Sequence, residues 1–530
     1  MTRARWLAVA VTAALSVPAL ADAKKPDRKK AGAKKDDAPP PMTSYEVELA
    51  IQGRETQIAV DRKRGIALLE EFIGKHATSR AMPEALYRLA ALYWERSQEQ
   101  FLAEMGAWAK QVDACKGDPE ACPDGPPAEP QLDFANAQAI YKRLIDKYPT
   151  FRKLDTVRYL YGFSLRDQGK AEEAQAQFRA IIEKHPGSTF VPDAWLAIGD
   201  YRFYGTNDFK GALEAYVHVL EHPQSDAYAM ALFKTAWCHW KLGDDEAAIR
   251  RFKEVLDQGS DPAADEAGRK RLADLREEAL EYLVQVIAED ETNTPKDIYD
   301  FLASIDGAQY SRRVLVRLGE AYEAQTRYDK SVPTYRFLVA LDTNHVDAAD
   351  LSLHVFTGLR GDGKVPQALD ELERIHGKYG PRTAWGKAHP KAAAKANEVA
   401  ASSLYDLGRS IHENAQAVEQ ATKVPDKERY GLAARAYDQF IARYPSHTEA
   451  VELSYLAGDI YRIKLKQLER AGDSYLRVGE SAPVGKLHRD ALLAAIGAYE
   501  GALASAPRTP ATSAATTPPP TTTTTTPPPT

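Results

Sequence analysis

The chain has 530 residues, 44% of them hydrophobic, and a formal net charge of −6. One ordinary core does not support this length, which indicates several domains or a solenoid that grows by repetition. The small net charge argues against general nucleic-acid binding, which needs a concentrated basic face. Ala, Leu, Glu, Lys, Arg and Tyr dominate, and long stretches lack strand alternation, so the composition favours an all-α solenoid.

Residues 1–21 have the pattern of an export signal. Arg3 and Arg5 supply a positive start, and residues 6–17 form an apolar stretch too short to span a bilayer comfortably. Ala19-Leu20-Ala21 is the predicted cleavage site, and a short membrane anchor is the alternative interpretation. No Cys directly follows the apolar stretch, so lipoprotein processing is not expected. The sequence therefore predicts a periplasmic protein without a stable membrane anchor.

Two segments of biased composition enclose the part predicted to fold. Residues 22–42 are rich in Lys and Pro and nearly lack apolar side chains, so we expect a disordered linker. Residues 504–530 contain mostly Pro, Thr, Ala and Ser, and we expect a disordered tail. The predicted folded parts are an N-terminal array at 43–256, an irregular helical segment at 257–312 and a C-terminal array at 313–503.

The chain has three cysteines. Cys115 and Cys122 lie in a predicted loop insertion at 106–132, and export to an oxidising compartment favours a disulfide between them. A metal site at these two residues is the alternative, but no nearby His or further Cys supports it. Cys238 is flanked by apolar residues and is predicted to be a buried, inert thiol.

A recurring pattern of small and aromatic residues occupies the predicted arrays. Gly162 and Ala174 are small where two helices would cross, Gly169 ends the first helix, Phe178 fills the space between helices, and Pro186 ends the second helix. Similar offsets recur in later segments, among them Gly199 with Tyr216, Ala236 with Phe252, Gly319 with Tyr335, Ala433 with Tyr437, and Gly458 with Tyr475.

This pattern resembles the tetratricopeptide repeat, a helix-turn-helix unit of about 34 residues. The resemblance covers about residues 60–500. It implies an all-α, right-handed superhelical solenoid of about eight to ten hairpins, which binds proteins and is not an enzyme. Endings such as Ile145–Pro149 are similar to those of exported repeat proteins in cell-envelope machines, including outer-membrane assembly, envelope division and gliding motility.

In tetratricopeptide proteins the first helix of each unit lines a concave face. Counting from the small residue of each unit gives the candidate partner-binding residues, many of them aromatic and so typical of binding hot spots. The alternative is that a tight superhelix buries them as core. The candidates are Tyr87, Trp94, Tyr159, Phe163, Arg166, Asp200, Phe203, Phe233, Trp237, Trp240 and Arg462.

Catalytic motifs are not evident. His218 and His222 have a spacing that could hold a metal on one helical face, but no third ligand accompanies them. Neither a phosphate-binding Gly-Lys-Ser/Thr loop nor a Gly-x-Ser-x-Gly elbow occurs. We therefore expect no cofactor and no catalytic site.

The leading functional hypothesis is an exported scaffold or adaptor in a multiprotein cell-envelope machine, such as gliding motility or outer-membrane biogenesis. Its partners would be other envelope proteins that place extended segments in the concave groove. One alternative is a module that binds peptidoglycan or another glycan through aromatic faces and the basic linker. Another is an enzyme with a site hidden around 257–312 or 380–430. The sequence leaves the partner's identity and the oligomeric state open.

Overall fold

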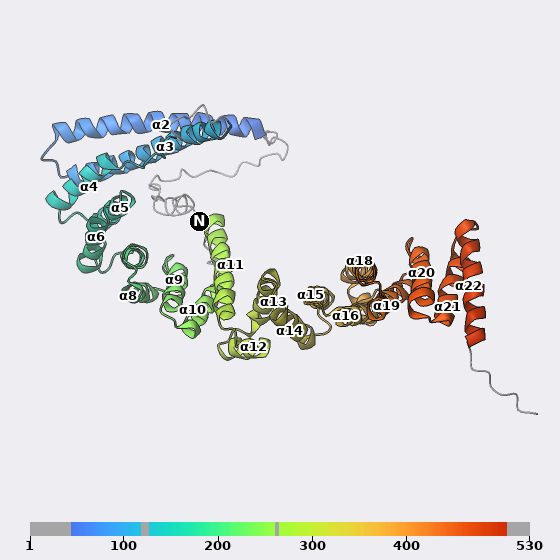
Figure 1. Cartoon of the computed structure of the whole chain (residues 1–530). Coiled ribbons are helices and arrows are strands. Elements are labelled where there is room, and N and C mark those ends of the chain that lie inside the picture. The colour runs from blue at the N-terminus through green and yellow to red at the C-terminus, as the bar shows by residue number, and fades with distance from the viewer. Residues whose placement is uncertain (1–43, 118–126, 260–263, 506–530) are drawn as a thin grey trace, which may run out of the picture. The chain divides into compact units, whose positions relative to one another are not determined.

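The computed structural model describes residues 44–117, 127–259 and 264–505, and within these ranges every regular element is a helix. This confirms the all-α prediction. The chain divides into two compact units, residues 1–157 and 158–530, and each is described by itself (Figure 1). The predicted signal peptide and the linker up to residue 43 lie outside the described residues, as does the predicted tail from residue 506 onward.

The first unit contains two long helices and a short one. They are α2 (Ser44–Lys75), α3 (Met82–Gly117) and α4 (Ala135–Lys147), followed by α5 (Leu154–Asp167), in which the boundary between the units falls. α3 packs along α2 and also on α4 (Figure 1). Because α3 continues to Gly117, the first part of the predicted loop insertion is helical.

The core of the first unit follows from helical spacing. Leu86, Ala90 and Trp94 are four residues apart, so they share one face of α3, and all three are buried. The Trp94 ring stacks on Phe134, with 3.9 Å between ring centroids, and lies 6.5 Å from Tyr141 on α4. Burying an aromatic side chain of this size contributes about 2–3 kcal/mol. Trp94 therefore fastens α3 to the segment that enters α4.

The second unit continues as a row of helices, most of which are shorter than α2 and α3. Its elements after α5 are α6 (Ala171–Lys184), α7 (Val191–Asp200), η2 (Tyr201–Gly205), α8 (Phe209–Leu220), α9 (Tyr228–Lys241), α10 (Asp245–Asp257), α11 (Glu266–Glu289), α12 (Pro295–Ser304), α13 (Ala308–Ala324), α14 (Tyr328–Leu341), α15 (Ala348–Gly361), α16 (Val365–Tyr379), α17 (Ala384–Ala388), α18 (Pro390–Thr422), α19 (Lys427–Arg443), α20 (Ala450–Asp459), η3 (Ile460–Leu465), α21 (Leu468–Ser481) and α22 (Lys486–Ser505). Within the described part of the chain, no helix combines the length and apolar character that a bilayer span requires.

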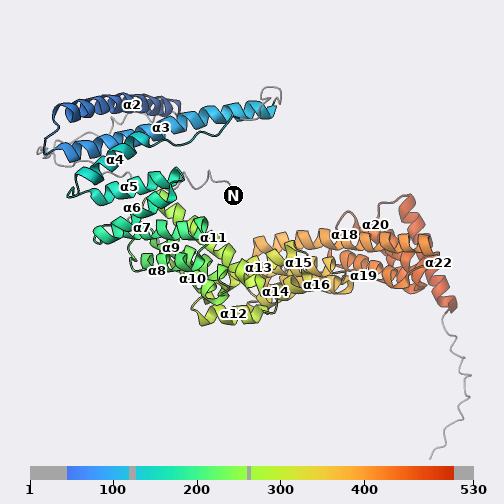
Figure 2. The ribbon, with the colours of Figure 1, turned by 60° about the vertical axis from the view of Figure 1, so that its left-hand side comes forward.

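Helices of the second unit pack mainly on their neighbours in sequence, which is the organisation of a solenoid (Figure 2). Together with α3–α4 of the first unit, eight of the contacting pairs have the order of helical hairpins along the chain, which confirms the predicted solenoid. The pairs are α3–α4, α5–α6, α7–α8, α9–α10, α13–α14, α15–α16, α18–α19 and α20–α21. In the segment predicted to be irregular, α11 packs on α10 and α13.

Left-handed residues close several of the turns between paired helices. Gly169 follows α5 with φ 74°, and Gly243 follows α9 with φ 77°. After α5, the N–H of Lys170 donates to the Leu165 carbonyl at 2.9 Å. This bond gives a partner to a carbonyl in the last turn of the helix, where the helix itself offers none. Glycine adopts this conformation without the steric cost of a side chain. The sequence signal that predicted a helix end at Gly169 is therefore confirmed.

Candidate interaction surface

Two of the helical pairs share a feature that sets them apart from the others: their first helix ends in a π-helical turn. These pairs are α7–η2–α8, with Gly199 and Tyr216 in contact, and α20–η3–α21, with Gly458 and Tyr475 in contact. In both pairs, the spacing from the glycine to the tyrosine is one residue longer than the spacing from Gly319 to Tyr335. A π-helical turn is wider than an α-helical turn and absorbs one extra residue. The additional residue therefore explains both η2 and η3.

The hydrogen bonds of the two π-helical turns agree with this account. At the end of η2 the Thr206 N–H donates to the Tyr201 carbonyl at 3.2 Å, five residues back. At the end of η3 the Lys466 N–H donates to the Tyr461 carbonyl, again five residues back. Each turn then passes through a left-handed residue, Asn207 with φ 54° in the first and Lys466 with φ 58° in the second.

In both pairs, a tyrosine hydroxyl of the second helix donates a hydrogen bond to a carboxylate of the first helix. The Tyr216 hydroxyl donates to Asp200 at 2.8 Å, and the Tyr475 hydroxyl donates to Asp459. Both rings are fully buried, and burial together with the neighbouring carboxylate raises the pKa of each phenol. The tyrosines therefore stay neutral and act as donors, which fixes the carboxylates at the end of each first helix.

A buried lysine of the next repeat joins the first of these pairs. Lys234 on α9 lies 2.9 Å from Asp200, and its side chain is only 9% exposed. Burial lowers the pKa of Lys234, but the charge of Asp200 and the hydroxyl of Tyr204 outweigh it, so the net shift is upward. Lys234 also lies over the Tyr204 ring, 4.8 Å from its centroid. The lysine thus links η2 to α9.

The thiol of Cys238 lies beside this charged group. It is fully buried, and burial raises its pKa to about 12, although the nearby Lys234 acts in the opposite direction. A thiol with so high a pKa holds very little of the reactive thiolate at neutral pH. The predicted inert character of Cys238 follows from this environment.

Aromatic side chains from three elements come together next to Lys234. We define the aromatic patch as Tyr204 on η2, Trp237 and Trp240 on α9, and Tyr282 on α11. The ring centroids of Trp237 and Tyr282 are 4.5 Å apart, and those of Trp237 and Trp240 are 5.0 Å apart. The Tyr204 side chain is 66% exposed, and the other three are half-buried. The patch is therefore partly accessible from outside.

Charged groups border the aromatic patch. The Lys241 ammonium lies 5.5 Å from the ring centroids of both Trp237 and Trp240. The Trp240 indole N–H donates to Glu289 on α11 at 2.9 Å. Near Tyr282, burial and the neighbouring Glu281 raise the pKa of Glu278. The patch is thus bordered by the Lys241 cation and by the carboxylates of Glu289, Glu278 and Glu281.

The predicted concave-face residues fall into three groups. Trp94, Phe163 and Phe233 are buried in the core, where they contact neighbouring helices. Arg166 and Arg462 are exposed. The half-buried residues are Tyr87, Tyr159, Asp200, Phe203, Trp237 and Trp240. Only some of these are brought together: Trp237 and Trp240 meet in the aromatic patch, and Asp200 anchors Lys234 beside it.

Other predicted residues contact separate partners. The Tyr87 ring lies 6.0 Å from Phe151 and carries Lys153 at 4.5 Å within the first unit. In the second unit, Tyr159 stacks on Phe190 with 4.6 Å between centroids. Arg462 lies over the Tyr475 ring. These residues therefore contact their own neighbours and do not join the aromatic patch.

Sequence reasoning missed Tyr204, Lys234 and Tyr282. Tyr204 and Lys234 do not occupy the offsets that the repeat pattern selects, and Tyr282 lies in a segment without a clear pattern. The signal that could have found Tyr204 is the extra residue between Gly199 and Tyr216, because an insertion at the end of a first helix must be absorbed by a wider turn. No local signal points to the pairing of Tyr282 with Trp237.

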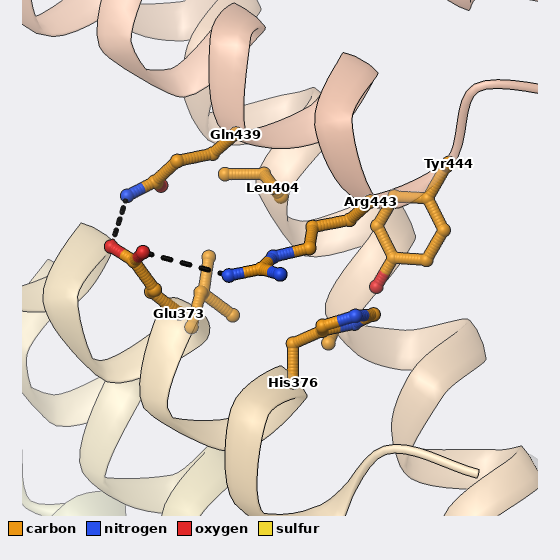
Figure 3. Close-up of a pocket in the computed structure, with 8 residues that line it drawn as sticks. Glu373, His376, Leu404, Gln439, Arg443 and Tyr444 are labelled. Carbon is orange, nitrogen blue, oxygen red and sulfur yellow. Dashed lines mark hydrogen bonds and ion pairs between the residues drawn. The ribbon is translucent and has the colours of Figure 1, made fainter. Parts of the chain in front are cut away.

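A small cavity lies between α16, α18 and α19 (Figure 3). Its volume is about 10 Å³, room for about one water molecule and for no substrate. Glu373 on its wall accepts a hydrogen bond from Gln439 at 2.9 Å and lies 3.6 Å from Arg443 (Figure 3). Glu373 is thus paired, whereas the Nδ1 atom of His376 and the Oε1 atom of Gln439 are buried without a hydrogen-bond partner.

A larger groove lies over α19, η3 and α21. Its volume is about 410 Å³, within the range of ligand-binding clefts. Asp438 in this groove pairs with Arg470 at 2.9 Å and accepts a hydrogen bond from Tyr461 at 2.6 Å. Asp473 accepts a hydrogen bond from Tyr499. Among the described residues, no group of three or more His, Cys, Asp or Glu is placed to hold a metal ion.

The predicted disulfide cannot be placed on the fold. Cys115 lies near the end of α3, whereas Cys122 lies outside the described residues. The pairing of Cys115 with Cys122 stays a prediction.

The fold defines an all-α solenoid of helical repeats, and comparison with known families identifies the repeat. Tetratricopeptide repeat models match residues 156–188 and 230–258, and a further one matches residues 426–484. The chain therefore carries tetratricopeptide repeats, as the pattern of small and aromatic residues predicted. Residues 156–188 cover the pair α5–α6, and residues 230–258 cover the pair α9–α10. Residues 426–484 cover α19 and the pair α20–α21.

Solved structures with similar folds share little sequence with this chain. The tetratricopeptide repeat domain of P58(IPK) is 15% identical, with a TM-score of 0.19, over 66% of this chain and 99% of that one. A tetratricopeptide repeat protein from Parabacteroides merdae is 13% identical, with a TM-score of 0.22, over 76% and 99%. A Rap protein complexed with Competence and Sporulation Factor is 13% identical, with a TM-score of 0.22, over 75% and 99%. No curated protein sequence matches the chain significantly.

Proposed function

We propose that this chain is a scaffold that holds a partner protein on the aromatic patch of its second unit. Tetratricopeptide repeats are an architecture suited to protein–protein interaction, because their stacked helices form an extended surface. The observation that carries the proposal is the meeting of Trp237, Trp240 and Tyr282 as half-buried rings on α9 and α11. Tryptophan and tyrosine on such a surface contribute disproportionately to binding energy.

The borders of the patch indicate the chemistry of the partner. An extended peptide segment would insert apolar side chains between the ring edges and place a carboxylate near Lys241. Lys241 is exposed and already lies over both indole rings, so an approaching carboxylate would be only partly desolvated. Beside Tyr282, Glu278 and Glu281 favour a basic residue of the segment. We therefore propose a partner segment with apolar anchors between an acidic and a basic residue.

Photo-crosslinking in cells tests the docking surface. A benzophenone amino acid replaces Lys241 beside the patch or, as the matched control, Lys210, which is exposed on the second helix α8. The proposal expects a discrete crosslinked protein from position 241 that is weak or absent from position 210. Equal crosslinking at both positions would count against a specific surface.

A second measurement separates binding from folding. Trp240→Ala should weaken binding of the crosslinked partner at least about tenfold, since a hot-spot truncation costs about 2 kcal/mol. Trp195→Ala is the control, because Trp195 is also half-buried but stacks on His218 of α8, at 4.3 Å, away from the patch. Equal losses in both variants would mean that general destabilisation, rather than the patch, is responsible.

We also propose that this scaffold works outside the cytoplasm, in a cell-envelope machine such as that of gliding motility or outer-membrane biogenesis. The support is the sequence of residues 1–21, with its positive start, apolar stretch and small-residue cleavage site. A fusion to alkaline phosphatase, which folds only after export, should be active with the full chain and inactive without residues 2–21. An active fusion lacking residues 2–21 would contradict this signal.

A further inference from the structure

The last described helix of the second unit is α22, which packs beside α21 (Figure 2). It has two apolar faces. The inward face carries Ala491, Ala495 and Ala498, all buried against α21. Leu492 and Tyr499 flank these alanines and lie close to Gly479 and Gly472 on α21. The alanines, with spacings of four and three, form the narrow stripe that joins α22 to the solenoid.

The outward face of α22 is also apolar at its centre. Leu493, Ile496 and Leu503 are 61%, 54% and 77% exposed, and Arg489 and Glu500 are exposed on the same face. These five residues are spaced four, three, four and three apart, which is the spacing of a coiled-coil seam. At about 100° per residue they fall within roughly 80° of the helix circumference.

An apolar outer face is unusual for the last helix of a solenoid, because terminal repeats need a polar face for solubility. Residues 506–530 contain only Ala, Pro, Thr, Ser and one Arg. They offer no large apolar side chain that could cover Leu493 and Ile496. Among the described residues nothing covers this face, since Leu493 and Ile496 are 61% and 54% exposed.

We propose that α22 pairs in antiparallel orientation with α22 of a second copy of this chain. Four residues of the seam, Arg489, Leu493, Ile496 and Glu500, are self-complementary, and Leu503 lies beyond them. A two-fold axis between Ala494 and Ala495 places Leu493 opposite Ile496 of the second copy, and Arg489 opposite Glu500 of the second copy. Because of the two-fold symmetry, each of the two contacts occurs twice in the dimer, as in every isologous interface. Neither Arg489 nor Glu500 has an ion pair among the described residues, so both charges are available for this pairing.

The size of the seam sets the expected strength. A helix of 20 residues is about 30 Å long, and the seam spans about two heptads. An interface this short buries less than a standard protein–protein interface, so the dimer should depend on concentration. A dissociation constant in the micromolar range is the expectation, on the order of 10 µM.

Sedimentation of the full chain between about 1 and 100 µM tests the proposal. The wild-type chain should shift from monomer to dimer across this range. Arg489→Glu or Glu500→Arg alone sets like charges opposite each other and should weaken dimerisation at least about tenfold. An equimolar mixture of the two variants should dimerise again, because each pair in the mixed dimer then joins opposite charges.

Controls keep the test independent of folding. All substituted side chains are exposed, so helicity measured by circular dichroism should not change. Lys391→Glu, an exposed reversal on α18, should leave dimerisation unaltered. A chain that stays monomeric at every concentration would overturn the proposal. So would a dimer that the single reversals leave intact, or one that the mixture of variants fails to restore.

Discussion

The two repeats with π-helical turns, α7–η2–α8 and α20–η3–α21, begin from the same local sequence and differ in what their neighbours add. Both have Gly-Asp at the end of the first helix and the same lengthened spacing to a tyrosine of the second, and both bond that tyrosine to the Asp. The cation beside Asp200 is the buried Lys234 of the following repeat. The cation beside Asp459 is Arg462 of the same turn, 3.7 Å away and 43% exposed.

This difference shows that one local pattern can serve two roles. In the first repeat the carboxylate is part of a charged contact between repeats, and the lysine of that contact also holds Tyr204 of the aromatic patch. In the second repeat the carboxylate pairs within its own turn, and the surface nearby is the charged groove over α19 and α21. A buried ion pair is costly to break, whereas an exposed pair contributes little. Three sets of substitutions measure how far the two repeats differ.

The largest effect is expected from Lys234→Met. It removes the cation beside Asp200 and leaves that carboxylate partly buried with only the Tyr216 hydrogen bond. The free energy of unfolding should fall by about 3 kcal/mol. Arg462→Met, the counterpart in the second repeat, should cost less than about 1 kcal/mol. Urea denaturation measures the loss, and hydrogen exchange of α7–α9 locates it. Similar losses in the two variants would remove the distinction between the repeats.

Substituting the two glycines should instead affect both repeats alike. A Cβ at Gly458 would lie 2.6 Å from the Tyr475 ring, and a Cβ at Gly199 would meet the Tyr216 ring in the same way. Because both rings are fully buried, Gly→Ala at either position should destabilise the chain by about 1–3 kcal/mol.

Gly377→Ala is the control for these glycine variants. Gly377 lies in α16, and a Cβ there would meet no atom within 4 Å. The substitution should stabilise the helix by roughly 0.5–1 kcal/mol. Thermal denaturation of the three variants measures the difference. A neutral Gly199→Ala would mean that α7 and α8 are not in close contact.

The smallest effect is expected at a carboxylate that lies six residues before the glycine of each Gly-Asp pair. This residue is Asp193 in the first repeat and Glu452 in the second. Burial, with Asp226 nearby, raises the pKa of Asp193 to about 6, well above its unfolded value of about 3.9. The folded state therefore binds the proton more tightly. This contribution to stability is complete below about pH 4 and is lost as the pH rises to about 6. Asp193→Asn should flatten that decline and stabilise the chain at pH 7 by on the order of 1 kcal/mol.

Glu452 provides the comparison in the second repeat. It is exposed and pairs with Arg409 at 3.1 Å, so Glu452→Gln should change stability by less than about 0.5 kcal/mol. Melting temperatures of both variants between pH 4 and pH 7 provide the measurement. A pH profile of Asp193→Asn that matches the wild type would show that Asp193 is not responsible for the decline.

Much of the fold was predictable from the sequence because the signals are local. Gly169 marks the end of α5, Phe178 and Tyr335 mark the contacts within a pair, and Pro186 marks the end of a second helix. Each works through nearby backbone conformation or side-chain spacing. The candidate surface was only partly predictable. Trp237 and Trp240 were identified from their offsets, whereas Tyr282 and Lys234 were not, since both contribute through contacts between repeats.

The predicted aromatic residues differ in how deeply they are buried. Trp94, Phe163 and Phe233 occupy the same offsets as residues that remain half-exposed, yet they are buried. Their offset in the repeat fixes the direction in which a side chain leaves its helix, and it does not fix how closely the next helix approaches. Phe233, for example, is covered by Tyr282, with 5.8 Å between ring centroids.

The sequence by itself determined the helices, their pairing into repeats and the places where helices end, because these depend on residues less than about one repeat apart. It also contained the extra residue that produces each π-helical turn. Only the tertiary structure decided that Lys234 meets Asp200, that Tyr282 completes the aromatic patch, and that one face of α22 stays uncovered. These outcomes depend on how neighbouring repeats stack, and the stacking is set by the packing of whole helix faces rather than by any single spacing.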